Sequence, residues 1–349
     1  MECYLDNSST TKELPEVKEA VIKCMEEDWG NPSAMHKKGV DAEMCVRGAR
    51  EQIADTLKCS PSEIIFTSGG TESNNLAITG TALAKKRQGK HIITTQIEHP
   101  SVANVMKALE GEGFEITYLS VDKRGQIDKE ELKAALRDDT ILVSIMHVNN
   151  EIGAAEPVEE IGKIVKEKAP AASFHVDAIQ SYGKFIIRPS KAKIDLLSVS
   201  AHKIGGLKGA GFLYIKDKTK INPVIFGGGQ QDNMRSGTEN VPGIAALGVA
   251  AKLAYTDFEE KQERMRRLKD DLSKRLRDLK GVTINSPDDG APHIVSASFE
   301  GIRSEVMLHA LEEMGVYVSA GSACSSHKRA LSATLVADKA LRSEEHTSE

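Results

Sequence analysis

Short apolar runs alternate with amphipathic stretches along most of the chain. The apolar runs are rich in β-branched residues, which favours strands. We expect strands at Ile64–Thr67, His91–Thr95, Glu115–Leu119, Thr140–His147, Ser173–Val176, Leu196–Ser200 and Gly211–Ile215. Between them, apolar residues recur at helical spacing, most clearly in Val102–Gly111, Lys129–Arg137 and Val158–Lys168. This alternation predicts a large α/β domain built on a mostly parallel, seven-stranded sheet.

The pattern changes near Tyr255. Residues Asp257–Leu279 are highly charged, with apolar residues at helical spacing, so we expect one long helix that leads to a smaller α+β domain. The elements expected there are strands at Val282–Asn285, His293–Phe299 and Val316–Ser319 and a helix at Ser304–Met314. The expected large domain spans 15–256, and the small domain combines 1–14 with 257–341.

Composition and charge exclude several classes of protein. The 349 residues carry a net charge of −5, so we expect no direct contact with nucleic acid. The five cysteines are irregularly spaced without a CxxC pair, which predicts no metal centre and no disulfide framework and fits a reducing cytoplasm. The longest apolar stretch, Ile244–Tyr255, contains Lys252 and is too short to span a bilayer, and no signal peptide is visible.

The motif SGGTESNN (68–75) lies between an expected strand and an expected helix. Small residues at such a turn leave backbone amides free to approach an anion, and the start of a helix favours negative charge. Thr71 can add a hydroxyl contact. A capping turn without a ligand explains the same residues.

Two further motifs place ionisable groups at strand ends, where open α/β sheets bind ligands. In FHVDAIQS (174–181), Asp177 could hold the protonated ring nitrogen of a cofactor and Gln180 could contact a ring oxygen, although Asp177 could also simply cap a turn. In SVSAHKIGG (198–206), Lys203 could form an imine with an aldehyde. Lys208 is the rival lysine, but its glycine-flanked position indicates a loop surface.

His99, in EHPSVAN (98–104), follows another expected strand. Its imidazole could stack on a flat cofactor and carry protons, or could cap a helix. Cys324 lies among Gly and Ser residues in VSAGSACSSHK (318–328), which predicts a mobile, exposed loop with a reactive thiol rather than a buried one. Two polar segments, at 147–153 around Asn150 and at 227–240, are either functional loops or plain connections.

Together, these motifs resemble the cysteine desulfurases (NifS/IscS-like) of the class V aminotransferase family. The resemblance runs from YLDNSSTT at Tyr4 to the Cys324 loop, and its motifs occur in the family's order. It implies the fold of pyridoxal-phosphate-dependent transferases of fold type I and a homodimer. It also implies pyridoxal 5'-phosphate as cofactor, with Lys203 as the lysine that bonds to it and Asp177 as the partner of its ring nitrogen.

The resemblance gives roles to the remaining motif residues. His99 matches the histidine that stacks on the ring and transfers protons, and Cys324 matches the cysteine that forms a persulfide. The residues that match contacts to the cofactor and substrate are Gly70, Thr71, Asn150, Gln180, Ser200 and His202. Thr238, in RSGT, resembles a phosphate contact that the neighbouring subunit donates.

The implied reaction converts L-cysteine to L-alanine and leaves the sulfur as a persulfide on Cys324. The sulfur then passes to an acceptor protein, either an iron–sulfur scaffold or a tRNA-thiolating enzyme. Selenocysteine lyase uses nearly the same chemistry, and an ordinary class V aminotransferase or epimerase would need Lys203 but not Cys324. A non-catalytic scaffold or sulfur-relay protein, or a catalytically impaired fragment that binds pyridoxal phosphate, is the remaining alternative.

The C-terminal region departs from the family pattern. The family continues past the cysteine loop to an arginine that binds the substrate carboxylate, and Arg342 does not align convincingly with it. We expect the segment RSEEHTSE (342–349) to be non-native and the chain to be truncated, although a naturally polar tail is the alternative. A truncated chain of this kind is expected to bind cofactor but to handle substrate poorly.

Overall fold

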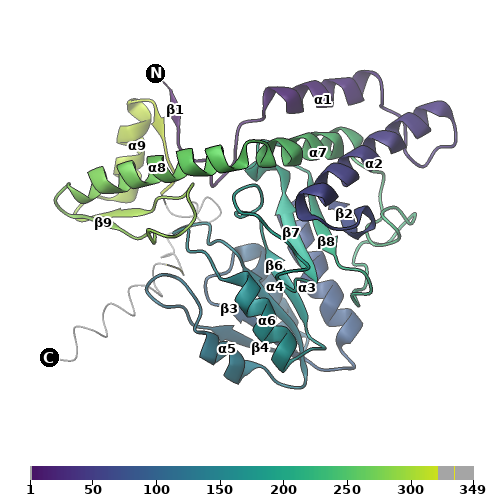
Figure 1. Ribbon diagram of the computed structural model, residues 1–349, viewed down its shortest axis with the longest axis horizontal. Coiled ribbons are helices and arrows are strands. Elements are labelled where there is room, and N and C mark those ends of the chain that lie inside the picture. Colours follow the sequence, from purple (N-terminus) through teal and green to yellow (C-terminus); the bar gives the residue numbers. More distant parts are fainter. Residues whose placement is uncertain (1, 321–333, 335–349) are drawn as a thin grey trace.

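A computed structural model describes residues 2–320 and residue 334. At its centre is a seven-stranded sheet with strand order β2-β8-β7-β6-β5-β3-β4 (Figure 1). The strands are β2 (Ile64–Thr67), β3 (His91–Thr95), β4 (Glu115–Leu119), β5 (Thr140–Met146), β6 (Ser173–Asp177), β7 (Leu196–Ser200) and β8 (Gly211–Ile215). All seven coincide with the expected strands to within one residue, because their apolar runs are sharply bounded.

The sheet is mostly parallel, as the sequence predicts. Strands β4, β3, β5, β6 and β7 all run in the same direction, whereas β8 runs antiparallel to both β7 and β2. The register aligns Met146 with Asp177 and Asp177 with Ser198. The carboxyl ends of three central strands therefore meet at one edge of the sheet.

Helices cover both faces of the sheet, so every side chain of the inner strands β5, β6 and β7 is buried, whereas the edge strand β4 is only partly buried. One face packs on α3 and α4, where Leu142 and Leu196 lie in the apolar clusters of those helices. The opposite face forms the main core with α2, α6 and α7, and there Val143 and Leu197 are buried. The helices are α1 (Pro15–Glu26), α2 (Lys37–Leu57), α3 (Gly70–Lys85), α4 (Pro100–Gly111), α5 (Lys129–Ala135), α6 (Val158–Lys168) and α7 (Val241–Tyr255).

The periodic pattern of the sequence did not predict helices at α1, α2 or α7. Helix α7 is apolar around most of its circumference and is buried among the other helices, so it has no amphipathic period that would identify it. Helices α1 and α2 both pack on α7 (Figure 1). These three helices are therefore recognisable mainly from their tertiary packing.

Helix α8 (Phe258–Arg277) is the expected long helix, and it extends away from the sheet. Beyond it lie β9 (Val282–Ile284), β10 (Ala297–Phe299), α9 (Ser304–Glu313) and β11 (Val316–Tyr317). The strands expected at His293–Phe299 and Val316–Ser319 are shorter in the structure, as β10 and β11. For β10 the reason is its pairing with the three-residue β9. Strand β1 (Cys3–Tyr4) pairs with β11, which brings the two ends of the described chain together. The expected domain boundaries at 14/15 and 256/257 stay a prediction.

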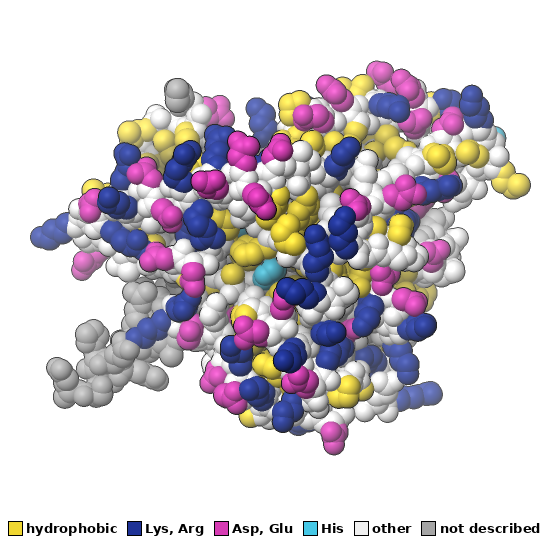
Figure 2. Space-filling view, in the orientation of Figure 1, with side chains coloured by type: hydrophobic (Ala, Val, Ile, Leu, Met, Phe, Trp, Pro, Cys, Tyr) yellow, Lys and Arg dark blue, Asp and Glu magenta, His cyan; other side chains and the backbone are white. Residues whose placement is uncertain are grey.

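The visible face of the molecule mixes basic and acidic side chains without a single-sign field (Figure 2). Large apolar side chains are nevertheless exposed around the loop that joins α1 to α2. They are Met25, Trp29, Met35, Val40 and Met44, and Met35 is 99% exposed. Among the described helices, none combines the length and apolar character that crossing a bilayer requires.

Two glycines test how tightly the layers pack. A Cβ at Gly162, on α6, would lie 1.9 Å from the backbone oxygen of Ala192, whereas a Cβ at Gly48, on α2, would meet nothing within 4 Å. We expect Gly162→Ala to lower the free energy of unfolding by about 1–3 kcal/mol, since backbone must move. Gly48→Ala should raise it by about 0.5–1 kcal/mol through helix propensity. Urea unfolding of both variants measures this, and equal effects would contradict it.

Candidate active site

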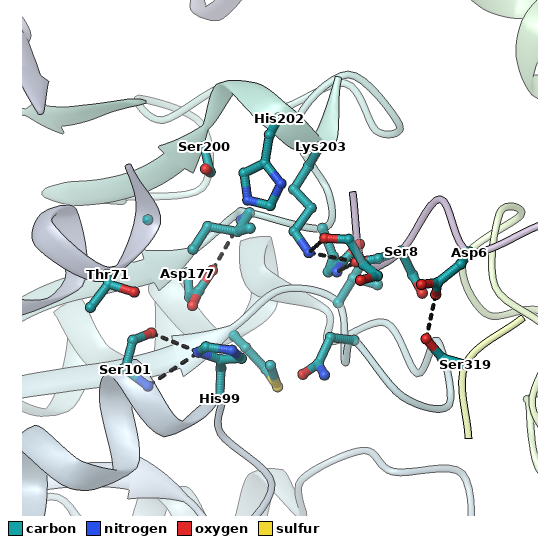
Figure 3. Close-up of a pocket in the computed structure, with 17 residues that line it drawn as sticks. Asp6, Ser8, Thr71, His99, Ser101, Asp177, Ser200, His202, Lys203 and Ser319 are labelled. Atoms are coloured by element: carbon teal, nitrogen blue, oxygen red, sulfur yellow. Dashed lines mark hydrogen bonds between the residues drawn. The ribbon is translucent and has the colours of Figure 1, made fainter. Parts of the chain in front are cut away.

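A cavity opens at the carboxyl edge of the central strands, where the sequence motifs converge (Figure 3). His99 follows β3, Asn150 follows β5, Asp177 ends β6 and Lys203 follows β7. Nine of the predicted site residues line this cavity: Gly70, Thr71, His99, Asn150, Asp177, Gln180, Ser200, His202 and Lys203. Parallel strands deliver their ends to one place, so motifs far apart in the sequence become neighbours.

The Asp177 carboxylate is buried at the floor of the cavity. Its Oδ1 accepts a hydrogen bond from the backbone N–H of Ile179 at 3.0 Å, and its Oδ2 accepts one from Asn74 Nδ2 at 2.8 Å. Burial raises the pKa of Asp177, although both hydrogen bonds oppose the rise. The two hydrogen-bond donors are neutral, so a cationic N–H that entered the cavity would stabilise the ionised carboxylate.

His99 both lines the cavity and caps α4, so the two roles considered for it coexist. Its Nδ1 accepts a hydrogen bond from the backbone N–H of Ser101 at 3.1 Å. Burial lowers the pKa of His99, which favours the neutral ring. Because Nδ1 is an acceptor, the neutral ring carries its proton on Nε2.

Lys203 lies in the short 3₁₀ turn after β7, at residues Ala201–Lys203. Its Nζ donates hydrogen bonds to the carbonyl oxygens of Ser8 at 2.5 Å and Ser9 at 2.7 Å (Figure 3). These contacts hold the Lys203 amine in the cavity. Lys208, by contrast, has an exposed side chain and pairs with Glu13, as its loop position predicts.

Gln180 is fixed at both ends of its amide. Its Nε2 donates to the carbonyl oxygen of Ser8 at 2.8 Å, and His293 Nε2 lies 3.4 Å from its Oε1. Burial holds the pKa of His293 well below its usual range, so the ring is neutral and can donate to the amide oxygen. The contact brings a residue from beyond α8 to the edge of the cavity.

The turn at SGGTESNN has the shape of an anion site. Gly69 has φ +146°, Gly70 begins the 16-residue helix α3, and both glycines line a second hollow. A Cβ on Gly70 would come within 2.1 Å of Ile179 Cδ1. The hollow is also lined by Thr71, Ser200 and His202, so amides and hydroxyls surround a space that suits a phosphate.

The N-terminal segment was missed as a part of the site. Asp6, Ser8 and Ser9 line the cavity, and the Thr10 hydroxyl lies 3.1 Å from His202 Nδ1. Ser319 Oγ donates to Asp6 at 2.6 Å and closes the same side. The residues of YLDNSSTT carry no periodic or charge signal of their own, because they act mostly through backbone carbonyls.

Three predicted residues stand apart from the cavity lining. Thr238 is exposed and lines neither hollow, which leaves its assignment to a neighbouring subunit as a prediction. Cys324 and Arg342 lie outside the described residues, as does the whole of 342–349.

A family model described as aminotransferase class V matches residues 3–342. The chain belongs to the class V aminotransferase family. It is 46% identical over 326 residues to a "putative cysteine desulfurase IscS 1" of Bacillus subtilis, covering 93% of this chain and 85% of the relative. It is also 46% identical to "cysteine desulfurase IscS" of Methanosarcina thermophila, with 93% and 80% covered. The sequence-based resemblance is thus confirmed.

Solved structures give the same result. A "NifS-like protein" aligns with a TM-score of 0.92 and 39% identity over 97% of this chain and 90% of its own. A structure titled "SspA in complex with cysteine" aligns with a TM-score of 0.84 and 35% identity, covering 97% and 94%. The family consists of pyridoxal-phosphate enzymes, and the chain has its fold, including the mostly parallel seven-stranded sheet.

Glu98, which precedes His99, provides a test of the electrostatics beside the cavity. Its Oε1 accepts from Met146 N and Thr95 Oγ1, whereas its buried Oε2 has no partner in the described structure. Burial raises the pKa of Glu98 to about 8 from the ordinary 4.5. The folded state therefore keeps a proton that the unfolded state has lost, so stability falls as pH rises from 4.5 through 8.

Between pH 6.5 and pH 8, the free energy of unfolding of the wild type should fall by about 1 kcal/mol more than that of Glu98→Gln. Glu156, whose pKa burial also raises to about 8, should maintain part of the slope in both proteins. Glu115→Gln is the matched control, since the exposed Glu115 pairs with Arg137, which lowers its pKa. Urea unfolding at several pH values measures the slopes, and identical slopes for Glu98→Gln and wild type would refute the assignment.

Proposed function

We propose that the protein is a pyridoxal-phosphate-dependent cysteine desulfurase, which converts L-cysteine to L-alanine and leaves sulfur as a persulfide on Cys324. The observation that carries the proposal is the convergence of Lys203, Asp177 and His99 in one cavity of a class V aminotransferase fold. The relatives named cysteine desulfurase, and the neighbour solved with cysteine, favour cysteine over selenocysteine as substrate and a desulfurase over an ordinary aminotransferase.

The residues fit this cofactor on three grounds. Asp177 is a buried carboxylate with only neutral hydrogen-bond donors, which suits a protonated ring nitrogen. The amides at the start of α3, with Ser200 and His202 beside them, suit the phosphate. Among the described residues that line the main cavity, Lys203 is the only lysine. When bound, pyridoxal phosphate supplies an electron-withdrawing ring that stabilises negative charge at the substrate α-carbon.

Each side chain then has a defined task. Asp177 would hold the ring nitrogen of the cofactor, and Asn74 and the Ile179 N–H orient the carboxylate for that contact. Lys203 would provide the amine that bonds to the cofactor, and its side chain can act as a base within the cavity. The neutral His99 lies over the same space and can deliver its Nε2 proton.

The atoms and electrons of the sulfur transfer balance without an added oxidant. The Cys324 thiolate attacks the substrate sulfur, the carbon–sulfur bond of the substrate breaks, and the carbon takes up a proton to give alanine. The atoms of L-cysteine and the Cys324 thiol are all found in L-alanine and the persulfide. A sulfur-acceptor protein, either an iron–sulfur scaffold or a tRNA-thiolating enzyme, completes the cycle by accepting the persulfide sulfur.

The functional unit that we propose is a homodimer. Thr238 is exposed on its own subunit, so it is free to reach the phosphate of a partner. Phe226, from the same polar loop region, is 81% exposed, and the exposed apolar side chains around the α1–α2 loop add further surface that water disfavours. A symmetric interface would bury such surface.

Replacing Lys203 tests the cofactor assignment. Lys203→Ala should fold but lose the visible absorption band that a lysine-bound pyridoxal phosphate gives, because no amine remains to form the bond. Lys208→Ala, in which the lysine is exposed, should keep the band. Absorption spectra after incubation with cofactor measure this, and an unchanged band in Lys203→Ala would exclude Lys203 as the bonded lysine.

Replacing Cys324 tests the sulfur acceptor separately from the cofactor. After incubation with L-cysteine, mass spectrometry of peptides should find one added sulfur on Cys324 of the wild type. Cys324→Ala should retain the absorption band but lose at least 100-fold in alanine formation, a loss of about 2.7 kcal/mol in transition-state stabilisation. Cys59→Ala, the half-buried matched control, should retain both the absorption band and alanine formation. Full alanine formation by Cys324→Ala would point instead to an aminotransferase-type reaction.

A further inference from the structure

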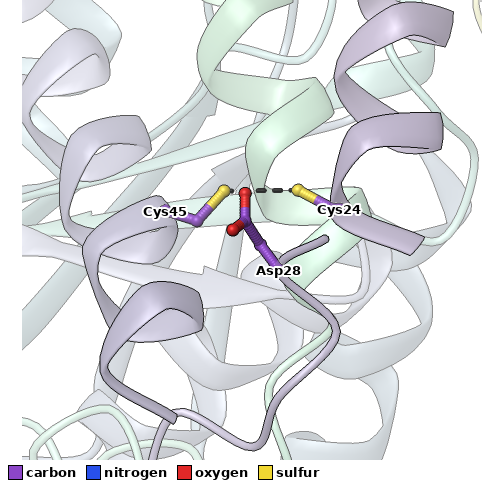
Figure 4. Close-up of side chains that lie close together, drawn as sticks. All are labelled: Cys24, Asp28 and Cys45. Atoms are coloured by element: carbon purple, nitrogen blue, oxygen red, sulfur yellow. Dashed lines mark hydrogen bonds between the residues drawn. The ribbon is translucent and has the colours of Figure 1, made fainter. Parts of the chain in front are cut away.

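A second cluster of reactive side chains lies between α1 and α2 (Figure 4). Cys24 is in the last turn of α1, Asp28 follows four residues later, and Cys45 faces them from α2. The two Sγ atoms are 3.3 Å apart, and one ligand atom from each of the three residues lies within 4.8 Å of the others. Three potential metal ligands therefore converge at the junction of two helices.

The cluster gathers groups that all become negative when they ionise. Cys24 is 2% exposed, its Sγ is hydrogen-bonded to Cys45 Sγ, and a carboxylate oxygen of Asp28 lies within 4.8 Å of both sulfurs. Lys23 Nζ lies 3.8 Å from Asp28, but its side chain is 65% exposed, so solvent screens this pairing. A cation placed between the three groups would offset the repulsion between their negative charges when both thiols are ionised.

Distances distinguish a metal site from a disulfide. A disulfide needs its sulfurs about 2.05 Å apart, so these would have to approach by roughly 1.2 Å. Two thiolates on a tetrahedral zinc ion, each about 2.3 Å from the metal, stand roughly 3.8 Å apart, so here they would separate by only about 0.5 Å. A disulfide also gives Asp28 no role, whereas a metal uses its carboxylate as the third ligand.

We propose that Cys24, Asp28 and Cys45 bind a borderline-soft divalent cation of the zinc type. Such an ion takes two thiolates and one carboxylate and keeps its fourth position for water. Binding releases two protons, one from each thiol, and the bound group keeps one negative charge. The irregular cysteine spacing predicted no metal centre, because one ligand is an aspartate and the third lies on another helix.

A metal ion at this site would link α1 to α2. Both helices pack on α7, and residues 27–36 join them (Figure 1). The other end of α1 is attached to the site, since Leu14 N donates to the carbonyl oxygen of Gly205 at 3.0 Å. Metal binding should therefore raise the thermal stability of the full chain.

Cobalt(II) titration of the chelator-treated full chain tests the proposal. The wild type should bind one equivalent per chain with a thiolate-to-cobalt charge-transfer band in the near ultraviolet, and zinc should abolish the band by competition. Cys45→Ser should lose the band, and Asp28→Asn should weaken binding at least tenfold. Cys59→Ser and Cys324→Ser are matched thiol controls, and both should keep the band.

Zinc should also raise the melting temperature of the wild type and of Cys59→Ser but not of Asp28→Asn, a partly exposed change that should spare the fold. The absence of a charge-transfer band in the wild type, or a band of full strength in Cys45→Ser, would overturn the proposal. So would an intact mass lower by two hydrogens that maps to a Cys24–Cys45 disulfide and appears in air without blocking by zinc. The measurements do not involve the cavity cofactor, so their outcome is independent of the proposed desulfurase activity.

Discussion

The parallel direction of β3, β5, β6 and β7 is the constraint on which the cavity depends. Parallel strands that share a sheet end at one edge, and the loops that follow them have no other place to go. His99, Asn150, Asp177 and Lys203 meet for that reason alone, although more than one hundred residues separate the first from the last. The antiparallel β8 pairs with β7, and its first residue, Gly211, packs closely against Gly69 in the turn at 68–70.

Burial is what makes the converging groups chemically useful. Removal from water raises the pKa of Asp177 and lowers the pKa of His99, so the cavity contains an acid that needs a cationic partner and a base held neutral. Backbone groups then select the orientation of each side chain, since Ile179 N fixes Asp177 and Ser101 N fixes His99. Packing likewise brings Cys24, Cys45 and Asp28 together between α1 and α2, where we propose a metal site.

Closure of the cavity depends on contacts between opposite ends of the described chain. The backbone of Ser8 accepts from both Lys203 and Gln180, and Asp6 accepts from Ser319. Strand β1 pairs with β11, and Thr11 further along the same segment donates to the carbonyl oxygen of His202. The N-terminal segment is therefore a wall of the cavity, and its position depends on the elements that follow α8.

The sequence by itself determined the seven strands, the long helix α8 and most of the cavity residues, because sharp apolar runs and strand-end motifs are local signals. It did not identify α7, whose uniformly apolar surface has no period, or α1 and α2, which pack upon it. Only the tertiary structure showed that Ser8 and Ser9 hold Lys203, since backbone carbonyls have no residue type to recognise. It alone also brought Cys45 to Cys24 and Asp28, because the distance between two helices is set by packing and not by spacing along the chain.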